Sequence, residues 1–196
     1  MKDMSTKLEP QDRARVLAWP YRAGGYGTIL ADPPWHFERD ELAGGRTSLS
    51  RLYTGTMSDE QIVALDVGGL AAPQAHLYLW TTEVHLEVAV ECVRAWGFER
   101  KHSFVWCKAS KDLDPQIGMG SYGRQAHELC LFAIRGRQPA LVHDVPTWFL
   151  APRGAHSAKP PHIHPIAERM SPGPRVELFA RRRVTGWTCW GNQVAP

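Results

Sequence analysis

The sequence predicts an α/β protein in which helices flank a mostly parallel β-sheet. Short apolar segments alternate along the chain with segments whose apolar residues recur at helical spacing. The 196 residues are 43% hydrophobic and 22% charged, which fits one globular domain with a core of its own. Long polar loops follow several of the apolar segments, as they do at the ligand-binding edge of a parallel sheet.

The first expected strand, residues 26–31, is an apolar run that ends abruptly in Asp32, Pro33, Pro34 and Trp35. A carboxylate at the end of a buried strand loses hydration, so it needs a partner. The two prolines stop the strand and leave carbonyl groups without a neighbouring N–H, and we expect Trp35 to be exposed. An acid, free carbonyls and an aromatic plane suit a flat molecule with an exocyclic amine, such as a nucleobase. Alternatively, the turn only ends the strand.

The later elements follow in the alternating order of such a sheet. Ser58 and Gln61 have capping-box spacing and begin a short helix that runs towards Leu65. Gly97 is a natural stop for the helix that precedes it. We expect longer helices at residues 83–96 and 161–170, and strands at residues 75–80, 104–107, 128–134, 147–150, 176–180 and 185–190.

Two long polar loops, residues 36–56 and 108–125, begin where expected strands end. Thr81 and the junction of Ala180 with Arg181 also follow strands, so we expect all of these to share one rim of the sheet with Asp32. Basic residues of the loops would contact phosphates, or would be ordinary solvated charges. These residues are Arg39, Arg46, Arg51, Lys108, Lys111 and Arg124.

Composition argues against several other classes of protein. No apolar run reaches the length of a membrane span, and the polar N-terminus does not resemble a signal peptide. Without any CxxC pair, the four cysteines predict buried free thiols and a cytoplasmic protein. The net charge of +3 is compatible with nucleic acid but does not require it. His162 and His164 lack the nearby ligands that would complete a metal site, so we expect none.

A series of motifs, in order and at matching spacing, resembles the MT-A70 family of S-adenosylmethionine-dependent N6-adenine methyltransferases. The motifs are ADPPW (31–35), YTGTMS (53–58), LYLW (77–80), WCK (106–108), HSAKP (156–160), ERM (168–170), VELFAR (176–181) and WGNQ (190–193). The resemblance implies a Rossmann-like methyltransferase sheet in which the catalytic motif precedes the cofactor motif, a permuted order. The methyltransferase domain would cover residues 26–196, after an N-terminal extension of residues 1–25.

The resemblance also implies roles for single residues. The catalytic turn would be Asp32, Pro33, Pro34 and Trp35, with Asp32 and the Pro33 carbonyl holding the target amine and Trp35 stacking on the base. Asp32 would also contact the methionine part of the cofactor. Further cofactor contacts would come from Lys159, Glu177, Phe179, Arg181, Asn192 and Gln193. Further substrate contacts would come from Tyr53, Lys108 and Glu128.

One departure from the family pattern concerns the ribose contacts. Some relatives have a histidine and an asparagine directly after the arginine that Arg181 matches, whereas this chain has Arg182 and Arg183. The departure therefore weakens any detailed assignment of ribose contacts beyond Arg181.

The function implied is methylation of the N6 amine of adenine in nucleic acid. DNA is favoured over RNA because the chain resembles compact prokaryotic or phage members without a separate recognition domain. The alternatives are N4 methylation of cytosine, since the same turn suits another exocyclic amine, and a non-catalytic nucleic-acid-binding subunit. We expect S-adenosyl-L-methionine as the methyl donor, nucleic acid as the partner, and a homodimer or heterodimer.

Overall fold

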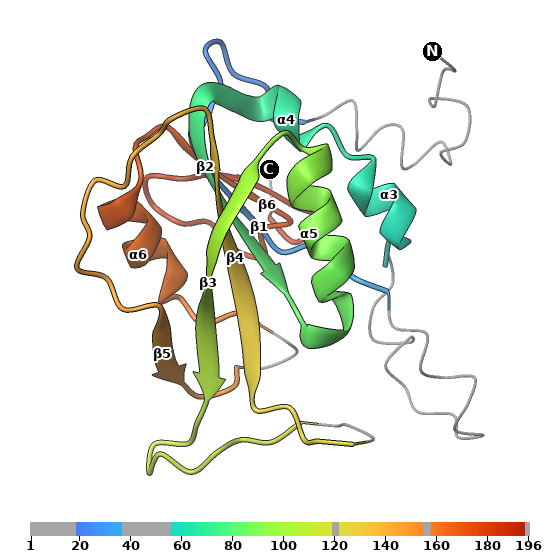
Figure 1. Cartoon of the computed structure of the whole chain (residues 1–196), viewed down its shortest axis with the longest axis vertical. Coiled ribbons are helices and arrows are strands. Elements are labelled where there is room, and N and C mark those ends of the chain that lie inside the picture. The colour runs from blue at the N-terminus through green and yellow to red at the C-terminus, as the bar shows by residue number, and fades with distance from the viewer. Residues whose placement is uncertain (1–18, 37–55, 119–121, 155–157, 195–196) are drawn as a thin grey trace.

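The centre of the computed structural model is a seven-stranded sheet with the strand order β5-β3-β4-β2-β1-β6-β7 (Figure 1). The structure describes residues 19–36, 56–118, 122–154 and 158–194. The strands are β1 Tyr26–Ala31, β2 Ala71–Thr81, β3 Glu99–Lys108, β4 His127–Arg135, β5 Trp148–Ala151, β6 Arg175–Leu178 and β7 Thr188–Trp190. Among them β4 alone runs antiparallel to its neighbours, and the other pairings are parallel. The predicted α/β fold with a mostly parallel sheet is confirmed.

Helices cover both faces of the sheet (Figure 1). The helices α3 (Asp59–Val63), α4 (Val67–Leu70) and α5 (Leu86–Ala95) bury their apolar residues in one core cluster. Helix α6 (Ile163–Met170) packs into a second cluster. Residues of β1 and β2 alternate between the two clusters, because successive side chains of a strand point to opposite faces.

Most local predictions are confirmed, with shifted boundaries. Ser58 caps α3 in a complete capping box with Gln61. Gly97 has φ +79°, the left-handed conformation that ends a helix most easily at glycine. The helix expected at residues 83–96 is instead a 3₁₀ turn, η2 (Glu83–His85), followed by α5. The short helix α4 was not predicted, because its four residues are too few to show a period.

Part of the predicted N-terminal extension packs against the sheet. Trp19 is 6% exposed and its ring lies 5.5 Å from that of Trp190 on β7. The packed unit therefore includes this residue as well as the described residues from 26 onward, and the domain boundary remains a proposal. Of the four free cysteines, Cys92 and Cys130 are buried as expected, while Cys107 and Cys189 are only partly buried. Across the described residues, the helices are too short or too polar to cross a bilayer.

The strand directions bring one edge of the sheet together, the carboxyl edge at which the parallel strands end. Ala31 is aligned with Leu178 of β6, and Leu178 with Trp190 of β7. Asp32, which follows Ala31, therefore stands at the same level as the residues that follow β6 and β7. Because β4 runs the opposite way, its first residues also lie at this edge, where Trp106 of β3 pairs with Glu128.

Candidate active site

The turn after β1 is held by hydrogen bonds on both of its proline carbonyls. The backbone N–H of Trp35 donates to the Pro33 oxygen (2.9 Å), and the backbone N–H of Met57 donates to the Pro34 oxygen (3.0 Å). The expectation that these carbonyls are free is therefore wrong, because the donors come from the turn itself and from the segment before α3. A carbonyl oxygen has two lone pairs, so the Pro33 oxygen retains the capacity for a second donor.

Trp35 is also placed differently from the expectation. Its side chain is 6% exposed rather than exposed, and its indole N–H donates to the Trp80 carbonyl at 3.1 Å. One ring face stacks on His85, with 5.3 Å between centroids and 23° between planes. The indole is thus part of the support beneath the turn, and the predicted stacking of a base on Trp35 would need this packing to open.

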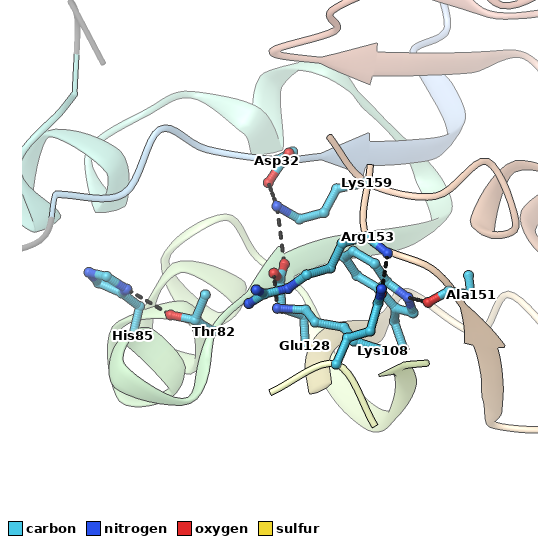
Figure 2. Close-up of polar contacts among 10 residues, drawn as sticks. Asp32, Thr82, His85, Lys108, Glu128, Ala151, Arg153 and Lys159 are labelled. Carbon is cyan, nitrogen blue, oxygen red and sulfur yellow. Dashed lines mark hydrogen bonds and ion pairs between the residues drawn. The ribbon is translucent and has the colours of Figure 1, made fainter. Parts of the chain in front are cut away.

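Four charged side chains form a continuous chain at the carboxyl edge (Figure 2). The Lys159 ammonium lies 2.9 Å from Asp32 Oδ1 and 3.2 Å from Glu128 Oε2. The other oxygen of Glu128 lies 2.7 Å from Lys108 Nζ. Each of these side chains is less than a fifth exposed, so the charges are shielded from water and depend on one another.

Two tryptophans line this chain of charges. The Lys159 ammonium lies 5.8 Å from the ring centre of Trp80, and the Lys108 ammonium lies 5.1 Å from that of Trp106. Trp106 is fixed in turn by a hydrogen bond from its indole N–H to the Ala151 carbonyl (2.8 Å). The negative faces of the rings add a favourable interaction with each ammonium. The lysines are therefore held by both carboxylates and indoles.

Glu128 and Lys159, the two central members of this series of charged side chains, keep their charge at neutral pH. Burial alone would raise the pKa of Glu128, but the charges and hydrogen bonds of Lys159 and Lys108 hold it below its ordinary value of 4.5. Burial alone would lower the pKa of Lys159, but Asp32 and Glu128 together raise it above its ordinary value of 10.5. The site thus presents fixed charges of both signs.

Glu128 gives a prediction for acid stability. Its pKa is lowered on folding, so its contribution is complete above pH 4.5 and is lost as the pH falls through the lowered value. At pH 7, Glu128→Gln should cost about 3 kcal/mol, because two buried ammonium groups lose a partner. Urea unfolding at pH 7 and below pH 4.5 should show this difference shrinking in acid. Exposed Glu91 provides the control, because Glu91→Gln should have the unfolding free energy of the wild type at both pH values. If Glu128→Gln differed from the wild type by the same amount at both pH values, the role given to the Glu128 charge would be contradicted.

The segments after β6 and β7 are locked together beside the turn. Phe179 has φ +62°, a conformation that costs an aromatic residue energy and is held here by its neighbours. Its ring packs edge-on against Trp190 at 5.6 Å, and the Ala180 N–H donates to the Trp190 carbonyl at 2.8 Å. A Cβ on Gly191 would collide with the backbone of Ala180, so only glycine fits there.

The predicted cofactor residues fall into two groups. Arg181 is half-buried after β6, and Asn192 and Gln193 are exposed after β7, so all three follow neighbouring strands at the carboxyl edge with Asp32. Glu177 instead lies within β6, and its carboxylate is 2.9 Å from Nε2 of His164 on α6. His164 occupies Oε2 of this carboxylate, so a contact from Glu177 to a cofactor would come from its other oxygen.

Some predicted residues lie outside the described residues, and some described residues were not predicted. Tyr53, Arg39, Arg46 and Arg51 belong to the first group. The sequence also gave no signal for Thr82 and His85, which lie beside the turn, or for Arg153, whose backbone N–H is bonded to Gln116 Oε1 at 2.8 Å (Figure 2). Arg153 lies two residues after the end of β5, so its position after an expected strand was the signal that could have indicated it.

The two histidines considered as metal ligands have other partners. His162 stacks on Phe149 with 5.0 Å between centroids, whereas His164 pairs with Glu177. Over the described ranges, no three potential metal ligands gather at one place.

Comparison with known proteins identifies the family. The family model for MT-A70 matches residues 26–193, which include the turn, Lys159 and the segments after β6 and β7. The chain belongs to the MT-A70 family. Its sheet is accordingly a Rossmann-like methyltransferase sheet, and the resemblance inferred from the motifs is confirmed.

Named relatives of this MT-A70 chain come from plants, animals and bacteria. It is 33% identical over 181 residues to a putative N(6)-adenosine-methyltransferase MT-A70-like protein of Medicago truncatula, a match that covers 88% of this chain and 27% of that protein. It is 30% identical to the human N(6)-adenosine-methyltransferase catalytic subunit METTL3, covering 87% and 28%. It is 29% identical to the type II methyltransferase M.MunI of Mycoplasma sp, covering 86% and 78%. The chain thus spans about a quarter of the length of the first two relatives.

Proposed function

We propose that this MT-A70 protein is an S-adenosylmethionine-dependent methyltransferase that methylates the N6 amine of adenine in nucleic acid. The observation that carries the proposal is the position of Asp32. Its carboxylate ends β1 at the carboxyl edge, is held by Lys159, and stands level with the segments that follow β6 and β7. The group that would bind the amine therefore adjoins the edge that would bind the cofactor. Relatives named N(6)-adenosine-methyltransferases support the choice of adenine N6.

The residues at this edge fit the chemistry of S-adenosylmethionine. The methyl donor has a carboxylate, an ammonium group and ribose hydroxyls, and it supplies an activated methyl group on a sulfonium. Lys159 would hold the carboxylate, and Asp32 would accept from the ammonium or from the target amine. Arg181, Asn192 and Gln193 would hold the ribose hydroxyls. Because the sulfonium already carries the activation, the reaction needs no metal ion.

Asp32 and the Pro33 carbonyl would prepare the amine for attack. The lone pair of the adenine N6 is delocalised into the ring, which makes this nitrogen a poor nucleophile. Lys159 is paired with Oδ1 of Asp32, so Oδ2 of the same carboxylate can accept one N–H. The second lone pair of the Pro33 oxygen can accept the other. These bonds would draw the nitrogen towards tetrahedral geometry and align it with the methyl group.

The proposal extends to DNA rather than RNA as the nucleic acid. The matched region makes up 78% of a bacterial type II methyltransferase but only 28% of human METTL3, so the match extends over more of the bacterial enzyme, and this favours DNA. An adenine inside a duplex would have to be flipped out or supplied on a single strand.

The expected dimer, cytoplasmic location and prokaryotic or phage origin remain predictions. Light scattering of the purified protein tests whether it is a dimer.

A panel of oligonucleotides tests this choice. The protein is incubated with radiolabelled methyl donor and matched DNA and RNA strands, single and duplex, each with and without adenine. We expect label in adenine-containing DNA and little in RNA. Stronger labelling of RNA would reverse the preference, and label in strands without adenine would favour N4 methylation of cytosine.

The non-catalytic alternative is tested by binding of the cofactor. A subunit that only binds nucleic acid has no need of the donor, whereas the proposed enzyme requires it. Isothermal titration calorimetry with S-adenosylmethionine should show one site per chain. Absence of binding to the folded protein, together with retained binding of nucleic acid, would support the partner-subunit alternative.

A further inference from the structure

His85 is a buried histidine beside the turn, and no motif drew attention to it. It is 5% exposed, ends the 3₁₀ turn η2 after β2, and precedes α5. Its ring nitrogens both have partners: Nε2 lies 2.7 Å from the His36 carbonyl oxygen and Nδ1 lies 3.0 Å from the Thr82 hydroxyl. A carbonyl oxygen only accepts, so Nε2 carries the proton and donates to His36.

The ring of His85 supports the turn as well. Its face stacks on Trp35, whose indole N–H is bonded to the Trp80 carbonyl. The imidazole therefore contacts the last residue of the turn through its plane and the next residue, His36, through its Nε2 proton. Figure 2 shows His85 and Thr82 bonded to each other on the η2 side of the charged chain.

The stack of His85 on Trp35 is linked to the Pro33 carbonyl by one backbone hydrogen bond. The backbone N–H of Trp35 donates to the Pro33 carbonyl at 2.9 Å, so the position of Trp35 sets the direction of that carbonyl. The Pro33 oxygen is the group that would hold the target amine beside Asp32. A shift of Trp35 would turn this oxygen away from the amine, and small misplacements of reacting groups are costly in rate.

We propose that His85 is a positioning residue for methyl transfer, which fixes the amine-holding turn through the Trp35 ring and the His36 carbonyl. The proposal rests on the proposed function for its effect on rate. It concerns geometry only: the contacts that carry it run from His85 to Trp35, His36 and Thr82, whereas the proposed cofactor contacts come from Lys159 and the segments after β6 and β7. Its removal should therefore impair turnover and leave binding of the methyl donor intact.

Three variants of His85 separate its two contacts. In His85→Ala, kcat should fall by roughly ten- to a hundredfold, because the turn loses both supports, while the dissociation constant for S-adenosylmethionine stays within about twofold. In His85→Gln the amide restores a donor to His36, and in His85→Phe the ring restores the stack on Trp35. Each should recover part of kcat, with glutamine closer to wild type if the hydrogen bond dominates.

A spectroscopic readout makes the test independent of activity. In ¹H–¹⁵N spectra, the Trp35 indole resonance is assigned with Trp35→Phe and should shift in His85→Ala. Val93→Ala is the matched control, because it removes methyl groups from the buried face of α5 near the carboxyl end of that helix, whereas His85 precedes its first residue. It should lower the thermal midpoint, keep kcat and leave the Trp35 resonance in place.

Three results would contradict the positioning role of His85, and a fourth would contradict the proposed function. Wild-type kcat in His85→Ala, an unmoved Trp35 resonance, or an equal loss of kcat in Val93→Ala would each overturn the positioning role. Absence of methyl transfer by the wild type would instead contradict the proposed function, and the indole resonance would still decide whether His85 fixes the turn.

Discussion

Replacement of Asp32 by alanine is expected to abolish methyl transfer while the fold survives. The variant removes the carboxylate that would accept an N–H of the target amine, and roughly a thousandfold loss of kcat is the size expected when a preorganised charged group is lost from a reaction site. Lys159 keeps Glu128 as a partner, so the unfolding free energy should fall by only about 1–2 kcal/mol. Single-turnover assays with labelled methyl donor and urea unfolding measure the two quantities.

Two controls sharpen this prediction. Asp32→Asn keeps an acceptor oxygen of the same shape without the charge and should retain an intermediate rate. Asp144 is a matched carboxylate elsewhere, because it forms an exposed ion pair with Arg169. Asp144→Ala should have the wild-type rate. Full activity in Asp32→Ala would refute the role given to this residue.

Replacement of Lys159 by methionine should affect both stability and cofactor binding. Without the ammonium, Asp32 and Glu128 become neighbouring buried carboxylates, which should cost about 3 kcal/mol at pH 7. Affinity for S-adenosylmethionine should fall roughly tenfold or more, because Lys159 would hold the carboxylate of the donor through a charge-assisted bond. Calorimetry measures the affinity, and urea unfolding measures the stability.

The double variant tests whether the chain of charges acts as a unit. Glu128→Gln in the Lys159→Met background removes the like-charge contact, so it should restore part of the lost stability rather than add to the loss. Lys101→Met breaks an exposed pair with Glu99 and should cost less than about 1 kcal/mol. Additive losses for Lys159 and Glu128 would contradict a shared network.

The sequence predicted the parts of the site that follow from strand ends. Asp32, Lys108 and Arg181 each come directly after an apolar run, and parallel strands place such residues at one edge. The same reasoning did not show that β4 is antiparallel. That direction explains why Glu128, near the beginning of its strand, meets Lys108 at the end of another.

The sequence could not predict contacts made between distant segments. Trp35 was expected to be exposed because it follows two prolines, yet Trp80 and His85 bury it. The proline carbonyls were expected to be free, yet Met57 supplies a donor from beyond the turn. Glu177 was assigned to the cofactor by its motif, while its partner His164 comes from a helix on the face of the sheet. Such pairings depend on how elements pack, which local patterns do not encode.

The most direct test of the central claim is to identify the methylated atom. Adenine-containing DNA is incubated with the protein and S-adenosylmethionine carrying a deuterated methyl group, then digested to nucleosides and analysed by mass spectrometry. The account predicts N6-methyl-deoxyadenosine with the full deuterated mass shift for the wild type, formed roughly a thousandfold more slowly by Asp32→Ala. A labelled cytidine in place of adenosine, or formation of the labelled adenosine at the wild-type rate by Asp32→Ala, would contradict the account.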